Sequence, residues 1–169
     1  MAAGSPSPRD LIHRKSGDPA RQQHLGPYVI EDLLTEAEEG AGTVYRVRIE
    51  PGCRTSVSYH RRAEEYYYVL SGSGKAFLGG REYELAAGDF LRLPPGTTHA
   101  FLTADEPLEM LNVHTPGCRP DRDVYFVDEV PRGFTAPPPG QPSSGPNRTG
   151  SGAVPGPPTP PPGRDPADG

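Results

Sequence analysis

Apolar and polar side chains alternate along several short stretches of this chain. Between residues 43 and 50, Tyr45, Val47 and Ile49 fall on one face of an extended segment, and charged or smaller side chains fall on the other. A period of two residues is that of a half-buried β-strand. Three successive tyrosines in the run 65–70 favour a strand over a helix, because aromatic side chains pack well on a pleated, half-buried surface. The pattern therefore predicts strands.

Turns rich in glycine and proline separate the expected strands. Gly79-Gly80 fits a two-residue hairpin connection, and the segment 71–74 is predicted to be a tight turn. The apolar run 28–34 is either a strand or one helical turn. The further strands are expected at residues 56–60, 65–70, 75–78, 81–85, 90–93, 99–102 and 108–114, with an edge strand at 123–127. Many short strands without a long helical pattern predict an all-β sandwich or barrel, whose interior is the place for a site.

Composition limits how much of the chain we expect to fold. The sequence has 169 residues, of which 23 are proline and 21 glycine, and the prolines are concentrated at the end. Such a segment buries too little apolar surface to offset its conformational entropy. We therefore predict a flexible N-terminal segment at residues 1–26, one barrel domain at 27–134 and a disordered tail at 135–169.

Charge and hydropathy exclude several classes of partner. A net charge of −5 argues against nucleic acid, because phosphate binding needs a clustered cationic surface. No apolar stretch has the length of a membrane span, and the N-terminus lacks the apolar core of a secretory signal. We expect a cytoplasmic protein that binds a small molecule. Cys53 and Cys118 lack the CxxC spacing of a metal or redox motif, and a structural disulfide between them is the minor alternative.

Two blocks of the sequence have the spacing of a known family. The second block has Gly88, then Pro94-Pro95-Gly96, then His99. The first block is Gly52, five residues, Ser58-Tyr59-His60, four residues, Glu65, six residues, Gly72. Together they resemble the two motifs of the cupins, with the short intermotif segment of small single-domain members. The resemblance implies the cupin double-stranded β-helix, a small jelly-roll-like barrel.

The resemblance also implies a metal site. It transfers His60, Glu65 and His99 as ligands of a divalent ion, with zinc, iron, manganese and nickel all open. The first motif usually carries His-x-His, and here Ser58 stands in place of the first histidine, where its hydroxyl could hold a water. His114 is a candidate replacement imidazole if its strand turns it inward. The second motif usually ends on asparagine, and here that place is Thr103.

Other readings of the same residues stay open. A histidine on a strand is more often hydrogen-bonded or exposed than a ligand, and Glu64-Glu65 could be a solvated acidic pair; the distance to Gly72 favours Glu65 as the inward residue. Tyr66 and Tyr68 are expected outside, where they would support a homodimer. The predicted substrate pocket or core comprises Ser58, Tyr67, Phe101, Met110 and Asn112.

Three functions compete at this point. The small cupins of bacterial aromatic polyketide biosynthesis, which this chain resembles in a general way, suggest a metal-dependent cyclase or isomerase that stabilises an enolate, with Glu65 or His114 moving the proton. A dioxygenase acting on an enolic or phenolic substrate would use the same ligands. A non-catalytic small-molecule-binding barrel is the third reading, because one barrel hosts many activities.

Overall fold

The structure, a computed structural model, describes residues 7–135. Strands dominate this part of the chain, and its two helices are single 3-10 turns, η1 (Pro19–Arg21) and η2 (Glu36–Glu38). The strands are β1 (Gln22–Leu25), β2 (Tyr28–Asp32), β3 (Thr43–Ile49), β4 (Ser58–Tyr59), β5 (Glu64–Ser71), β6 (Ser73–Leu78), β7 (Arg81–Ala86), β8 (Phe90–Leu93), β9 (His99–Leu102), β10 (Leu108–Thr115) and β11 (Tyr125–Phe126). The all-β prediction is confirmed.

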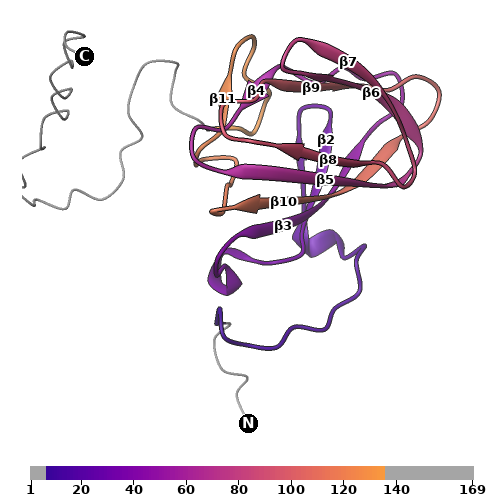
Figure 1. The fold of residues 1–169 in the computed structure, drawn as a ribbon. Coiled ribbons are helices and arrows are strands. Elements are labelled where there is room, and N and C mark those ends of the chain that lie inside the picture. Colours follow the sequence, from indigo (N-terminus) through magenta and orange to yellow (C-terminus); the bar gives the residue numbers. More distant parts are fainter. Residues whose placement is uncertain (1–6, 136–169) are drawn as a thin grey trace, which may run out of the picture.

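The strands form two antiparallel sheets that face each other as the walls of a small barrel (Figure 1). One sheet has six strands in the order β1-β2-β3-β10-β5-β8, and the other has five in the order β11-β4-β9-β6-β7. Alternate residues of β3 are buried, as the sequence pattern predicts. Ile49 and Met110 from the larger sheet pack with Phe101 from the smaller one, and all three are fully buried. The apolar faces of both sheets therefore form one core.

Most strands lie where they were predicted, between the glycine and proline turns. The Gly79-Gly80 hairpin is confirmed, since Leu78 pairs with Arg81 across it. The run at 28–34 is resolved as strand β2. The tight turn predicted at 71–74 is wrong, because only Gly72 separates β5 from β6 and these two strands belong to different sheets.

Gly72 carries the chain from one sheet to the other. Its φ of 79° is in the left-handed region, and a Cβ at this position would lie 1.8 Å from the carbonyl oxygen of Pro107. Glycine alone tolerates both conditions. Gly72 therefore forms a sharp bend between the two sheets. A glycine-rich segment predicts such a bend and a hairpin turn equally well, so the local sequence could not separate them.

The larger sheet starts before residue 27. Gln22–Leu25 pair with β2, within the segment 1–26 that we predicted to be flexible. The buried carboxylate of Glu31 also accepts hydrogen bonds from the backbone of Gly17 and from Arg21. The division of the chain at residue 27 stays a prediction, and the tail at 136–169 lies outside the described residues.

Nothing in residues 7–135 has the helix length and apolarity that a membrane crossing would need.

Candidate metal centre

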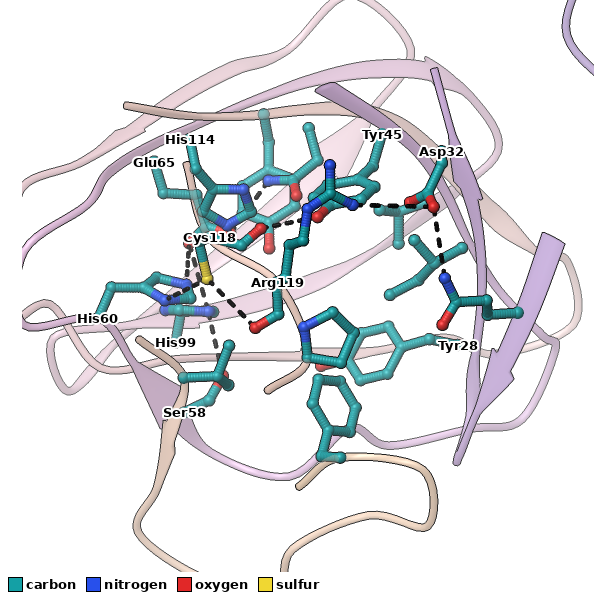
Figure 2. Close-up of a pocket in the computed structure, with 18 of the residues that line it drawn as sticks. Tyr28, Asp32, Tyr45, Ser58, His60, Glu65, His99, His114, Cys118 and Arg119 are labelled. Carbon is teal, nitrogen blue, oxygen red and sulfur yellow. Dashed lines mark hydrogen bonds and ion pairs between the residues drawn. The ribbon is translucent and has the colours of Figure 1, made fainter. Parts of the chain in front are cut away.

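Strand pairing brings the predicted ligands together inside the barrel. Glu65 on β5 pairs with His114 on β10, and His99 at the start of β9 pairs with Ser58 on β4. His60 follows β4 directly. All of these side chains are buried, with Glu65 only 2% exposed. Figure 2 shows His60, His99, His114 and Glu65 grouped at one side of a cavity.

The carboxylate of Glu65 lies at the middle of this group. Its Oε2 is 3.4 Å from Nε2 of His60 and 3.3 Å from Nε2 of His99. The three residues offer ligand atoms that all lie within 4.8 Å of one another. The neighbouring Glu64 lies on the outer face, where it pairs with Arg92. The structure therefore points Glu65 inward, as the spacing to Gly72 suggests.

Backbone carbonyls orient the two imidazoles toward the carboxylate. Nδ1 of His60 lies 2.7 Å from the carbonyl oxygen of Asp123, and Nδ1 of His99 lies 3.2 Å from that of Thr97. A carbonyl oxygen can only accept, so each Nδ1 carries the hydrogen. In the neutral ring the Nε2 lone pair then faces Glu65. A ligand histidine that donates its other N–H to a carbonyl is the usual support around a protein metal ion.

The second carboxylate oxygen of Glu65 has partners of its own. Nδ2 of Asn112 donates to Oε1 at 3.0 Å, and Nε2 of His114 lies 2.9 Å from the same atom. Nδ1 of His114 is 3.4 Å from the hydroxyl of Thr43, which donates to the carbonyl of Cys118. His114 therefore points into the barrel, which was the condition for its role as a replacement imidazole. It contacts Oε1 of Glu65, whereas His60 and His99 lie near Oε2.

The residues present fit a divalent cation on the Oε2 side. Oε2 is buried and has no hydrogen-bond partner among the described residues. Burial alone would raise the pKa of Glu65, but the charges of His99 and His114 hold it well below its usual range. A buried anionic oxygen between two imidazole lone pairs is a donor set that suits zinc or non-haem iron. His60 Nε2, His99 Nε2 and Glu65 Oε2 would hold the ion.

The pKa of His60 is raised in the absence of a metal ion, so its imidazole is protonated at neutral pH. Burial lowers the pKa of this imidazole, but the neighbouring Cys118 thiol and the charge of Glu65 raise it to about 11. Burial also lowers the pKa of His99, and the charge of Glu65 opposes this shift. Since an imidazole must lose its proton to bind a metal, ion binding at this site would release the proton of His60.

Ser58 occupies the position of the missing first histidine. Its hydroxyl lies 3.1 Å from Nε2 of His99, and the side chain lines the cavity. Tyr67 and Asn112 also line the cavity, and their contact with a substrate stays a prediction. Phe101 and Met110 do not line it, because both are fully buried in the core between the sheets. Of the two alternatives for this pair, pocket wall or core, the structure places them in the core.

The C-terminal loop supplies residues that the sequence did not suggest. The Asp123 carboxylate accepts hydrogen bonds from the backbone of Arg61, Arg62 and Ala63, and so fixes the loop that holds His60. Asp123 has a φ of 60°, and no local sequence motif predicts this left-handed conformation. Arg119 and Cys118 also line the cavity. From the sequence, Cys118 was considered only for a disulfide with Cys53, and Arg119, the next residue, carried no signal.

Cys118 defines a second possible ligand group, with His60 and His114. Both cysteines are free, so no disulfide joins Cys53 to Cys118. The sulfur of Cys118 lies 3.3 Å from Nδ1 of His60, the nitrogen already bonded to the carbonyl of Asp123. Burial raises the pKa of the thiol, which donates to the carbonyl of Arg122. The geometry favours the group built on Glu65, because only there do two Nε2 atoms face an oxygen that lacks a partner.

The cavity beside the centre is lined mainly by apolar and aromatic side chains. It is partly open to solvent, and aromatic rings form much of its wall. Tyr28, Tyr45, Phe126 and Phe134 belong to this wall. Concave sites with an apolar lining and a few convergent polar groups are the usual form of small-molecule pockets.

Fold and centre together define the class of protein: the chain belongs to the cupin family. The cupin domain model matches residues 45–114, which span strands β3 to β10. The strand order and the two motif blocks agree with this assignment.

Individual relatives extend the match beyond the domain. Protein SchB of Streptomyces halstedii is 30% identical over 110 residues, which cover 64% of this chain and 80% of SchB. Polyketide synthase CurC of Streptomyces cyaneus is 29% identical over 101 residues, or 59% of this chain and 66% of CurC. Among solved structures, the nucleoside dehydratase Pac13 of Streptomyces matches with a TM-score of 0.54 and 22% identity, over 70% of this chain and 94% of Pac13. That last likeness bears on the fold.

Proposed function

We propose that this protein is a metal-dependent enzyme of small-molecule biosynthesis that cyclises or isomerises an oxygenated, polyketide-like substrate through its enolate. The observation that carries the proposal is the unpartnered Oε2 of Glu65 between Nε2 of His60 and Nε2 of His99. The similarity to polyketide synthase CurC supports the substrate class. A divalent ion in this site would supply a Lewis acid for a substrate carbonyl.

The chain's own residues account for proton movement and for shielding. Nε2 of His114 lies within hydrogen-bond distance of Oε1 of Glu65, and Nδ1 is backed by Thr43. The Glu65–His114 pair can therefore hold the proton that leaves the carbon next to the carbonyl and return it at another position. The net proton balance of an isomerisation is then zero. Tyr67, Val124 and Phe126 form apolar wall beside the centre and limit the access of water to an enolate.

Metal analysis of the purified protein tests this proposal. We expect about one zinc, iron, manganese or nickel ion per chain by elemental analysis, and loss of that ion in His60→Ala and in His99→Ala. Cys53→Ala is the matched control, because Cys53 is half-buried and lies outside the cavity lining. A metal content of zero in the wild-type protein and in all variants would favour the non-catalytic binding barrel.

The dioxygenase alternative uses the same residues. Two imidazoles and one carboxylate are the set that non-haem iron oxygenases use, with positions left open for O₂ and substrate. Oxygen uptake in the presence of an enolic or phenolic substrate separates the two activities. Cyclisation or isomerisation consumes no oxygen, and dioxygenation consumes one O₂ per turnover.

A homodimer is part of the same proposal. Tyr68 and Leu70 on β5 and Phe90 on β8 are 46%, 45% and 61% exposed on the outer face of the larger sheet. Tyr66 stacks against Phe90 beside them. A second copy would cover this apolar surface. Light scattering should give twice the chain mass, and Phe90→Ser should lower it.

A further inference from the structure

The cavity has a second polar end, away from the metal centre. Figure 2 shows Asp32 on the side of the cavity opposite His60 and His99, with Arg119 extending toward it. Gln23 of β1 completes this end, and its amide lies 3.4 Å from Oδ2 of Asp32. None of these three residues contacts the residues that would hold the ion. The proposed chemistry therefore leaves them without a role.

Arg119 keeps part of its guanidinium available to the cavity. The residue is 7% exposed, and its Nε donates to Glu39 at 2.7 Å while Nη2 donates to the carbonyl of Leu34. Among the described residues, Nη1 has only Oδ2 of Asp32 nearby, at 3.8 Å, which is beyond hydrogen-bond distance. A buried guanidinium with an N–H pair facing a cavity is suited to donate to an oxygen of a ligand.

Asp32 offers the complementary acceptor. Its Oδ1 is buried and has no hydrogen-bond partner in the described part of the chain. Buried polar atoms are nearly always satisfied in native proteins, so a single unpartnered carboxylate oxygen beside a cavity indicates a missing donor. Burial raises the pKa of Asp32, which is consistent with a carboxylate that gains from a hydrogen bond to a hydroxyl.

Aromatic rings line the path between the two ends. Phe134 packs edge-on against Tyr28 and Phe126, with ring centroids 6.2 and 5.0 Å apart. Tyr45 packs edge-on against His114 and donates its hydroxyl to the carbonyl of Cys118, so its polar group is already used. These walls favour a flat, conjugated molecule over a flexible polar one.

We propose that Asp32 and Arg119 form a second subsite of the cavity, which binds two neighbouring oxygens at the far end of a flat, conjugated substrate. A hydroxyl of the substrate donates to Oδ1 of Asp32, and a second oxygen, in a hydroxyl or a carbonyl, accepts from Nη1 of Arg119. Oxygens in a 1,3 relationship on an unsaturated ring fit this donor and acceptor pair. The inference rests on the proposed function for the other end of the substrate, which would lie at the metal centre.

Calorimetry with two matched probes tests the subsite. Both 3,5-dihydroxycinnamate and cinnamate carry a carboxylate for the centre, and only the first carries two hydroxyls in a 1,3 relationship. We expect the dihydroxy compound to bind the wild-type protein about tenfold more tightly, since hydrogen bonds to charged groups are the strong ones. Asp32→Asn and Arg119→Gln should each reduce this ratio to about threefold or less and leave cinnamate binding unchanged.

Controls separate this inference from the proposed function. The exposed Asp121→Asn, two residues from Arg119, should keep the tenfold ratio. His60→Ala should weaken both probes equally and preserve the ratio, and elemental analysis should show the same metal content in Asp32→Asn as in wild type. A wild-type ratio near one, or a ratio unchanged in Asp32→Asn while that variant melts as wild type does, would overturn the subsite even if the metal is present.

Discussion

The carbonyl oxygen of Asp123 lies 2.7 Å from Nδ1 of His60 and so decides which nitrogen of that imidazole faces Glu65. The same residue anchors the loop from Arg61 to Ala63 through its carboxylate. One residue near the end of the described chain thus fixes both the loop and the ring. Support of this kind typically changes metal affinity by a factor of about 10 to 100 when it is removed.

Asp123→Ala should therefore weaken metal binding by about 10-fold to 100-fold without removing a ligand. The substitution deletes three hydrogen-bond acceptances and places alanine at a φ of 60°, so Asp123→Gly is needed to separate the two effects. Competition with a chromophoric chelator measures the affinity. If Asp123→Gly binds metal as tightly as wild type does, the carboxylate has no part in holding His60.

The two adjacent glutamates should behave differently. Glu65→Gln removes an inward ligand oxygen and should abolish metal retention, whereas Glu64→Gln changes an outer-face residue paired with Arg92 and should leave it intact. Elemental analysis after gel filtration gives the answer. Equal losses in the two variants would mean that the strand is shifted by one residue, which exchanges inside for outside.

His114 and His99 should also be separable. His114 contacts Oε1 of Glu65 on the side away from the proposed ion, so His114→Gln should lower metal affinity less than His99→Gln. We expect the His114 variant to lose roughly tenfold, as for a residue that supports a ligand, and the His99 variant to lose metal entirely. Chelator competition on both variants measures the order. The reverse order would make His114 a ligand and His99 its support.

The acid stability of the protein should depend on Glu31. Burial alone would raise the pKa of this carboxyl, but hydrogen bonds from Gly17, Asp18 and Arg21 lower it. A lowered native pKa adds stability that is complete above the unfolded pKa of about 4.3 and is lost as pH falls through the native value. Glu31→Gln should lose about 1–3 kcal/mol at neutral pH and show a flatter acid limb in urea titrations. An unchanged acid limb would show that the N-terminal segment is not held by this residue.

Truncation should separate the tail from the barrel. Phe134 packs against Tyr28 and Phe126, so removal of residues 136–169 should change the melting temperature by less than about 2 °C. A protein ending at residue 131 loses the half-buried Phe134 and should melt roughly 4–8 °C lower, since the loss of its packing contacts costs about 2 kcal/mol. Differential scanning fluorimetry compares the two. A large loss in the longer protein would mean that part of 136–169 stabilises the barrel.

The fold class could be predicted from the sequence, and the resemblance to the cupin motifs pointed to His60, Glu65 and His99. Period-two alternation at Tyr45, Val47 and Ile49 and the glycine and proline turns are local signals, and a strand's faces follow from its period. The spacing from Glu65 to Gly72, which resembles that of the first cupin motif, favoured Glu65 as the inward glutamate. Local signals of this kind can be interpreted without knowledge of any distant residue.

The residues that support the site could not be predicted from the sequence, because they come from distant segments of the chain. Asp123 contacts His60 from a loop far along the chain, and Arg119 and Asp32 line the cavity from a loop and a strand end. These placements depend on the pairing of distant segments. The bend at Gly72, which moves the chain between sheets, is likewise indistinguishable from a hairpin in the local sequence. Contacts between distant segments are set by the packing of the whole barrel. Local periodicity carries no information about them, so they could not be predicted from the sequence.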